Sequence, residues 1–326
     1  MQHKTKTILS GIRATGKLHV GNYLGALKQF INLQNQGYKC FFFVADLHAL
    51  TTPFEPKELR TQTYEVVAEY IAAGLDPEQS TIFLQNHIAE HTELAWALNC
   101  VTPIGELERM TQYKDKAKTH TANINAGLFT YPTLMAADIL LYKPDMVPVG
   151  DDQTQHLELT RSLAKRFNQR FGKTFPEPKN YLLKPLRIRS LQDPEKKMSK
   201  TADIPVYISD SPEDIATKLK KAVTATTGGG ASAGVDNLFF LLEIFGTEDE
   251  HKYFVDAEKE GTIKYSELKA TLASRIAEHF ADFRAKKQEL MKDKEYVAEI
   301  LAEGARKARL TASHTLAEVK EKLGLL

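Results

Sequence analysis

The chain has 326 residues, with 43 Lys and Arg against 42 Asp and Glu and a formal net charge of +1. This length predicts two domains at about 100–200 residues each, and the near-neutral charge excludes a uniformly basic nucleic-acid binder. Two cysteines, Cys40 and Cys100, are too few for a disulfide framework or a four-cysteine zinc site. We expect a cytoplasmic globular enzyme with no membrane span, because the longest apolar run, CFFFVA, is far too short to cross a bilayer. The N-terminal MQHKTKTILSG lacks the apolar stretch of a secretory signal.

Short apolar runs alternate with helical patterns in the first half of the chain. The predicted strands are residues 7–10, 40–46, 81–85 and 146–150. A helix is predicted from Asn22, where Leu24, Leu27 and Ile31 share a face, and the next helix is predicted to end at the glycine of Ala73–Gly74. Strands that alternate with helices indicate a parallel sheet covered on both faces.

The pattern changes after about Pro176. A basic loop, RSLQDPEKKMSKTAD, is followed by the stretch 224–234, which has no periodicity and predicts a mobile linker. Beyond Ser266 the apolar spacing is helical. We therefore predict an α/β fold in which a Rossmann-like, parallel-sheet catalytic domain spans 1–205 and an α-helical domain spans 206–326, whose last helix packs back on the first domain.

Two short motifs imitate other enzyme classes. GIRATGK (11–17) resembles a phosphate-binding loop, but Leu18 stands where that loop needs a hydroxyl for Mg²⁺, and the helix is predicted to start too late. HIAEH (87–91) matches an inverted zinc-protease motif but has no third ligand at helical spacing. We interpret HIAEH as a solvated loop and predict no protein metal site.

Two further motifs, TGKLHVGN (15–22) and KKMSKT (196–201), make chemical sense when taken together. His19 and Gly21 lie at the turn into the predicted helix, where backbone N–H groups favour an anion and a glycine lets a nucleotide approach closely. A loop with Lys197 and Lys200 is suited to close over a triphosphate. GDDQTQH (150–156) follows a predicted strand end, which is where open α/β sheets bind ligands.

This pair resembles the signature of class I aminoacyl-tRNA synthetases, with HVGN in place of HIGH and KMSKT in place of KMSKS. The segments GNYLGAL, GELERMTQ (105–112), YPTLMAADILLY (131–142) and VPVGDDQTQH (147–156) are similar to the bacterial tryptophanyl-tRNA synthetases in particular. The similarity runs in order from about Ile8 to Thr201 and more loosely to the C-terminus. These motifs together identify the chain as resembling that family.

The resemblance implies a two-step reaction. L-Tryptophan and ATP give tryptophanyl-adenylate and pyrophosphate, and the acyl group then passes to tRNA(Trp). Such chemistry depends on positioning and charge stabilisation and needs no covalent enzyme intermediate. The resemblance also implies Mg²⁺ bound with ATP, an anticodon-binding role for 206–326, and a homodimer.

The resemblance assigns catalytic and ATP-binding roles residue by residue. The catalytic set is His19, Lys116, Lys197 and Lys200. The ATP-binding set is Arg13, Ala14, Thr15, Gly21, Asn22, Gly150, Asp151, Asp152, Ile188, Lys197, Met198, Ser199, Lys200 and Thr201. From the sequence alone, Lys116 is equally well explained as a surface charge.

Asp138 is the informative carboxylate, because it shares a predicted helix face with Leu134, Met135 and Leu141 and therefore needs a partner. One interpretation is a salt bridge to an arginine elsewhere in the chain. The other, which follows from the resemblance, is that Asp138 accepts the indole N–H of tryptophan. The implied tryptophan-binding set is Leu9, His48, Tyr131, Met135, Asp138, Val147, Val149 and Gln153.

The chain departs from the family pattern in places. Arg13 replaces a glutamine, Leu9 an aromatic, Leu47 a glutamine and Thr201 a serine, which affects the fine geometry of substrate binding more than the nucleotide site. A tyrosine-specific relative and a paralogue that does not charge tRNA remain as alternatives, with a nucleotidylyltransferase and a P-loop NTPase less favoured. Tryptophan-dependent ATP–pyrophosphate exchange distinguishes them.

Overall fold

A computed structural model describes residues 6–14, 16–119, 124–150, 153–182, 186, 188–198, 204–224 and 233–326, without the side chains of 116–119 and 182. By its contacts the chain divides into two compact units, each discontinuous in sequence. The first comprises Met1–Thr15, Lys28–Lys184 and Leu290–Leu326, and the second comprises Gly16–Leu27 and Pro185–Glu289. These units differ in their boundaries from the predicted domains 1–205 and 206–326. The catalytic role of 1–205 and the anticodon-binding role of 206–326 stay predictions.

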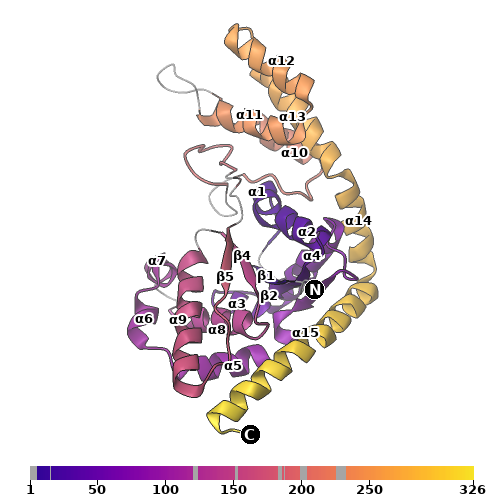
Figure 1. Ribbon diagram of the computed structural model, residues 1–326. Coiled ribbons are helices and arrows are strands. Elements are labelled where there is room, and N and C mark those ends of the chain that lie inside the picture. Colours follow the sequence, from indigo (N-terminus) through magenta and orange to yellow (C-terminus); the bar gives the residue numbers. More distant parts are fainter. Residues whose placement is uncertain are drawn as a thin grey trace, which may run out of the picture. The chain divides into compact units, whose positions relative to one another are not determined.

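The first unit contains a five-stranded parallel sheet in the order β3-β2-β1-β4-β5. Figure 1 labels β1, β2, β4 and β5. The strands are β1 (Thr7–Arg13), β2 (Lys39–Ala45), β3 (Ser80–Leu84), β4 (Met146–Val149) and β5 (Lys179–Leu182). The four predicted strands and the predicted parallel sheet are confirmed. The strand β5 was not predicted, because KNYL is short and polar at its start and lies at a sheet edge.

Helices connect and cover these strands. Those of the first unit are α2 (Lys28–Asn35), α3 (Asp46–Ala49), α4 (Pro56–Ala72), η2 (Gln85–His87), α5 (Glu90–Asn99), α6 (Ile104–Glu108), α7 (Thr111–Thr119), α8 (Ala126–Leu140), α9 (Thr154–Phe171) and α15 (Lys294–Leu323). The end of α4 is as predicted: Gly74 has φ +117°, and Leu75 N–H donates to the Tyr70 carbonyl at 3.1 Å.

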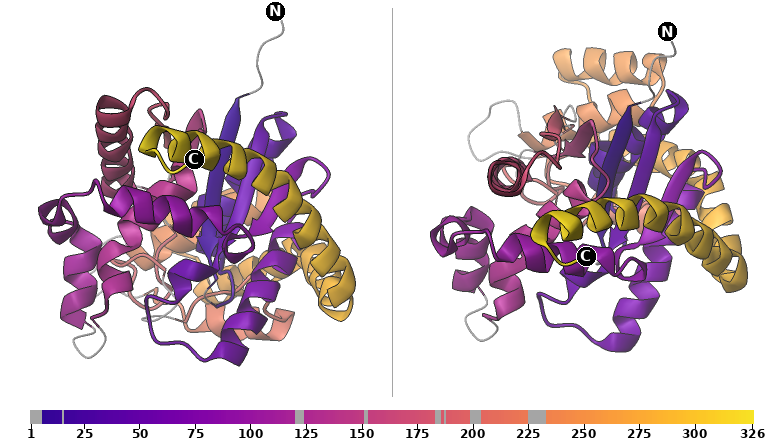
Figure 2. Two further views of the ribbon diagram at one scale, coloured as in Figure 1. Left: turned by 90° about the horizontal axis from the view of Figure 1, so that it is seen from below. Right: turned by 60° about the horizontal axis from the view of Figure 1, so that its bottom comes forward.

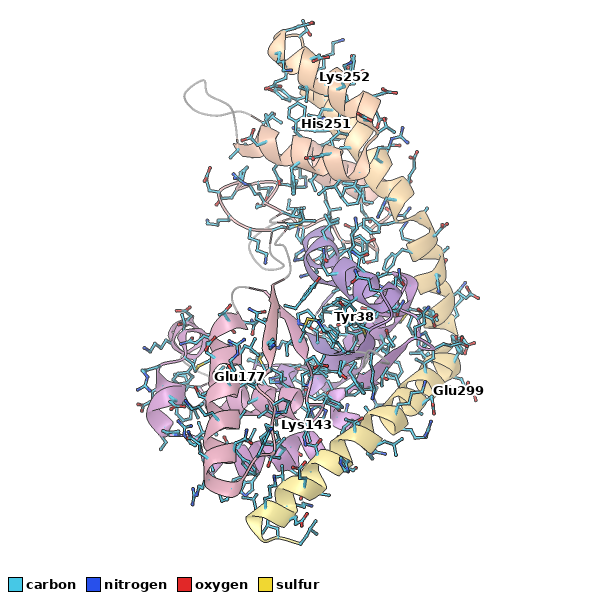
Figure 3. All side chains as sticks on the ribbon, viewed as in Figure 1. Tyr38, Lys143, Glu177, His251, Lys252 and Glu299 are labelled. Carbon is cyan, nitrogen blue, oxygen red and sulfur yellow. The ribbon has the colours of Figure 1, made fainter. Side chains whose placement is uncertain are left out.

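The long helix α15 packs on β3 and α5 and closes one side of this unit (Figure 2). Its buried side chains include Ala305, Ala308, Ala312, Leu316 and Val319, which join the same core as Phe83 of β3. Lys143, labelled in Figure 3, pairs with Glu318 of α15 at 2.6 Å. The C-terminal helix is therefore part of the sheet-containing unit.

The second unit combines a short N-terminal segment with the helical part of the chain. Its helices are α1 (Val20–Asn22), η1 (Tyr23–Leu27), α10 (Pro212–Lys220), α11 (Ala233–Phe245), α12 (Glu248–Lys259), α13 (Tyr265–His279) and most of α14 (Ala281–Lys292). Val20 N–H donates to the Val206 carbonyl at 2.9 Å, and Ile208 N–H donates to the Leu18 carbonyl at 3.0 Å. These bonds join the HVGN segment to residues 206–208.

Two boundaries differ from the predictions. The helix predicted from Asn22 begins at Val20, because His19 caps it. The predicted linker 224–234 ends in helix, since α11 begins at Ala233, while 225–232 lie outside the described residues. Within the described part of the chain, no helix combines the length and apolar character needed to cross a membrane.

Candidate active site

Asp138 is the centre of a buried polar cluster in the first unit. It lies on α8 with 1% of its surface exposed. Its Oδ1 is 2.6 Å from His91 Nδ1 and accepts from Gln85 Nε2 at 2.7 Å, and its Oδ2 is 2.8 Å from His48 Nε2. The predicted proximity of His48 and Asp138 is thus observed. No arginine bonds to Asp138 among the residues that the structure describes; the carboxylate is held by two histidines and a glutamine.

These contacts determine the charge of Asp138. Burial alone would raise its pKa, but the hydrogen bonds from His48 and His91 outweigh burial and lower the pKa to about 2. Asp138 is therefore ionised at neutral pH, and it is a strong hydrogen-bond acceptor.

We expected HIAEH to be a solvated loop, and this prediction is wrong. His91 is fully buried on α5, and its ring nitrogens contact Asp138 and the hydroxyl of Tyr142, at 2.9 Å for the latter. The loop prediction fails because His91, Leu94, Ala95 and Leu98 form the inner face of a helix packed on α8. His87 lies outside this helix, in η2, and its carbonyl accepts from Arg309.

Sequence reasoning missed three members of the cluster, namely Gln85, His91 and Tyr142. The spacing of His91 with Leu94, Ala95 and Leu98 was the available signal, since it places the histidine on an apolar helix face. Gln85 and Tyr142 carried no local signal, because their partners are 53 and 51 residues away in the chain.

The other side chains of the predicted tryptophan set also belong to the first unit. Leu9, Val147 and Val149 are buried in the core, with Met135 packed against it. The ring of Tyr131 lies edge-on to His48, with centroids 6.1 Å apart. Gln153 precedes α9, and its N–H donates to the Gly150 carbonyl at 3.0 Å. The fold thus places the apolar set in one core, while His48 and Gln85, two polar partners of Asp138, follow the carboxyl ends of β2 and β3.

Tyr131 and Arg13 influence each other electrostatically at this sheet edge. Tyr131 is 8% exposed, its hydroxyl is 2.7 Å from His156 Nε2, and burial raises its pKa to about 12 against the opposing effect of Arg13. Burial lowers the pKa of Arg13, whose Nη2 donates to Thr52 Oγ1 at 2.8 Å. The phenol is neutral, so its oxygen can accept a hydrogen bond from a cation.

The HVGN residues form a capping box in the second unit. Asn22 N–H donates to His19 Nδ1 at 3.2 Å, and His19 N–H donates to Asn22 Oδ1 at 3.3 Å. His19 is 4% exposed. A Cβ added at Gly21 would lie 3.0 Å from the His19 ring and 3.7 Å from Ile188 Cβ, so glycine keeps this turn compact.

The described part of KMSKT adjoins the same turn. Met198 N–H donates to the Ile188 carbonyl at 3.0 Å, and Lys197 pairs with Arg189 in an antiparallel bridge. Both Ile188 and Met198 are buried. The structure therefore brings Gly21, Asn22, Ile188, Lys197 and Met198 into one unit with His19.

The remaining ATP-set residues divide between described and undescribed positions. Ala14 is buried and Gly150 is exposed, both in the first unit. Thr15, Asp151, Asp152, Ser199, Lys200 and Thr201 lie outside the described residues, as does the side chain of Lys116, which belongs to α7 rather than to a loop.

Comparison with known proteins assigns the chain to a family. Residues 1–281 match the model for class I tRNA synthetases of the W and Y type. The chain belongs to this family. It is thus an aminoacyl-tRNA synthetase, and the class I fold suggested by the sequence is confirmed.

The relatives of this synthetase are similar over their whole length. It is 45% identical to a tryptophan–tRNA ligase of Clostridium tetani, covering 100% of this chain and 98% of that protein. It is 46% identical to the same enzyme of Rickettsia conorii, covering 98% and 99%. A crystal structure of tryptophanyl-tRNA synthetase from Campylobacter jejuni, complexed with ADP and tryptophan, matches with a TM-score of 0.88 at 33% identity, over 98% of this chain and 100% of that one.

Proposed function

We propose that this synthetase is a tryptophan–tRNA ligase. It activates L-tryptophan with ATP to tryptophanyl-adenylate and pyrophosphate, and then transfers tryptophan to tRNA(Trp). Full-length relatives at 45–46% identity that carry this name support the proposal. The structural observation that carries it is Asp138, an ionised carboxylate beside an apolar set at the carboxyl edge of the sheet.

On the amino-acid side, Asp138 accepts the indole N–H. The apolar side chains of Leu9, Met135, Val147 and Val149 pack the ring, and His48 lies beside it. Tyr131 and Gln153 bind the substrate ammonium. The buried, neutral hydroxyl of Tyr131 supports this role, because it accepts a hydrogen bond without adding a charge.

On the nucleotide side, a carboxylate oxygen of tryptophan attacks the α-phosphorus of ATP while the bond to the pyrophosphate oxygen breaks. His19, Lys116, Lys197 and Lys200 stabilise the charge on the phosphates. The other proposed ligands are Arg13, Ala14, Thr15, Gly21, Asn22, Gly150, Asp151, Asp152, Ile188, Met198, Ser199 and Thr201. Mg²⁺ enters with ATP, bound by phosphate oxygens, which are the hard ligands that this ion prefers.

The test is ATP–pyrophosphate exchange with purified protein and each of tryptophan, tyrosine and phenylalanine, followed by charging of tRNA(Trp). Exchange that requires tryptophan, together with charging, is the expected result. Exchange that requires tyrosine would instead indicate a tyrosine-specific enzyme. Exchange without charging would indicate a paralogue that does not aminoacylate tRNA.

We further propose that the helical segment 206–326 contacts the anticodon of tRNA(Trp), in the cytoplasm. A groove of about 520 Å³ in the second unit, lined by residues of α10, α13 and α14, supports this. Its lining includes the apolar Ala270, Ala273 and Ala277, the cationic Lys220, Lys269 and Arg284, and the acidic Glu278. Cationic side chains bind phosphates, and an apolar lining accommodates a base.

A homodimer is the proposed assembly. Trp96 on α5 is 72% exposed and Ile104 on α6 is 66% exposed, and large apolar side chains in such positions are typical of an interface. Trp96 is the single tryptophan of the chain, so its fluorescence reports on this surface. We expect a dimer by analytical ultracentrifugation and a blue-shifted Trp96 emission that moves to the red on dilution. A monomer with solvated Trp96 emission at all concentrations would contradict this assembly.

A further inference from the structure

A buried histidine lies directly behind Asp138, and none of the roles proposed above includes it. His91 has no exposed surface, and it connects the Asp138 carboxylate, 2.6 Å from its Nδ1, to the Tyr142 hydroxyl, 2.9 Å from its Nε2. The rings of Phe43 and Phe83 flank it, with centroids at 6.0 and 6.2 Å. Apart from these rings, the described partners of the imidazole are its two polar contacts with Asp138 and Tyr142.

The Tyr142 hydroxyl contacts the second ring nitrogen of His91. Its hydroxyl pKa is raised well above the usual value, chiefly by burial and further by the negative charges of Asp138 and Glu90. The phenol therefore stays protonated, and its O–H can donate a hydrogen bond to His91 Nε2. The ionised Asp138 carboxylate can only accept hydrogen bonds, so His91 donates to Asp138 Oδ1 through Nδ1–H.

This bond determines which oxygen of Asp138 is left for a ligand. Oδ1 accepts from both His91 and Gln85, which fills its two acceptor positions. Oδ2 accepts from His48 alone among the described residues, and the side chain of His48 is 13% exposed whereas that of His91 is 0%. The two oxygens of one carboxylate thus have different tasks.

We propose that His91, held at its second ring nitrogen by Tyr142, is a positioning residue for amino-acid recognition, which holds Oδ1 of Asp138 so that Oδ2 faces the substrate N–H. The inference rests on the proposed tryptophan specificity and deepens it. His91 touches no substrate; it acts through Asp138. The other charged or titratable groups around the chain of hydrogen bonds are His48 on α3, Glu90 on α5 and Arg309 on α15.

Two amide substitutions distinguish the loss of the hydrogen-bond donor to Asp138 from the loss of the ring volume. The amide of His91→Asn places an N–H near the position of Nδ1, towards Asp138. The longer His91→Gln places its amide near the position of Nε2, towards Tyr142, and removes the donor that His91 provides to Asp138 Oδ1. Both variants bury one amide, so they are matched in polarity and differ in which partner they serve.

Steady-state exchange kinetics give the readout. We expect His91→Gln to lower kcat/KM for tryptophan about tenfold, mainly through KM, and to reduce the preference for tryptophan over phenylalanine, because a buried acceptor loses its partner. His91→Asn should restore most of this loss. The KM for ATP should be unchanged in both variants. Tyr142→Phe should raise the tryptophan KM less than His91→Gln, since the imidazole remains but loses its contact at Nε2.

Leu98→Ala is the control for a loosened helix. Leu98 is fully buried on the same helix as His91 and is not a partner of Asp138. Equal effects of His91→Asn and His91→Gln, or a tryptophan-specific loss in Leu98→Ala of the same size, would overturn the proposal. If His91→Gln does not fold, the comparison of His91→Asn with Tyr142→Phe decides: an unchanged tryptophan KM in Tyr142→Phe contradicts the role of the Tyr142 contact. A wild type whose exchange does not need tryptophan would refute the proposed function instead.

Discussion

Asp138 is a negative charge inside the first unit, and three donors on α3, η2 and α5 make its burial possible. A buried ion with satisfied hydrogen bonds is a discriminating acceptor, because a ligand without a matching donor leaves it partly unpaired. In the proposed function, this carboxylate therefore decides which amino acid is recognised.

Asp138→Asn tests this recognition. The amide offers one acceptor oxygen and turns an NH₂ group towards donors, so we expect kcat/KM for tryptophan to fall by about 10- to 100-fold. The margin over phenylalanine, about 10⁴–10⁵ in sites built to bond a substrate N–H or O–H, should narrow. The measurement is pyrophosphate exchange with both amino acids. Unchanged discrimination would mean that Asp138 serves only as the partner of the two histidines.

The same carboxylate also links stability to acid. Burial opposes ionisation, but the hydrogen bonds from His48 and His91 prevail and hold the pKa at about 2, below the value of about 3.9 in an unfolded chain. Because the folded pKa is the lower one, the stabilisation is complete above about pH 5 and is lost as the pH falls towards 2. The free energy of unfolding, measured with urea at pH 6 and pH 3, should fall more in the wild type than in Asp138→Asn. Equal falls in both proteins would argue against this linkage.

At the scale of elements, the contact between α15 and β3 depends on a glycine. A Cβ added at Gly304 would lie 1.8 Å from the Ile82 carbonyl oxygen, so the helix backbone rests directly on the strand. We expect Gly304→Ala to destabilise the protein by about 1–3 kcal/mol, as overpacking does. Gly25→Ala is the control, since Gly25 is also helical and has no atom within 4 Å of its added Cβ. In thermal melts we expect a lower Tm for Gly304→Ala than for Gly25→Ala. Equal Tm shifts in the two variants would refute the close approach of α15 to β3.

Apolar runs were sufficient to predict most elements of the sheet. CFFFVA and MVPV were recognised because strands buried on both faces are continuously apolar. The apolar pattern failed where a capping residue or a packing partner determines whether a helix forms. The helix starts at Val20 because of the His19–Asn22 capping box, and HIAEH is partly helical because α5 has α8 to pack against.

At the scale of the whole molecule, the C-terminal helix belongs to the sheet-containing unit although it follows the helical segment in sequence. Its apolar face includes Val297, Leu301, Ala308, Leu316 and Val319. None of the proposed catalytic, ATP-binding or tryptophan-binding residues lies in it. Deletion of 294–326 should nevertheless leave the protein insoluble or without tryptophan-dependent exchange, because the core at β3 and α5 would be opened to water. Deletion of 325–326, whose side chains are exposed, is the control and should be neutral. A soluble, active 1–293 would refute this dependence.

The sequence by itself determined the fold class, the strands β1 to β4 and the family, because apolar periodicity and short ordered motifs are local properties of the chain. It also indicated Asp138, since a carboxylate on an apolar helix face demands a partner. The tertiary structure alone decided who that partner is. No sequence signal links Gln85 and His91 to Asp138 or Tyr142 to His91, and only the folding of η2, α5 and α8 into one unit brings their polar atoms within hydrogen-bond distance.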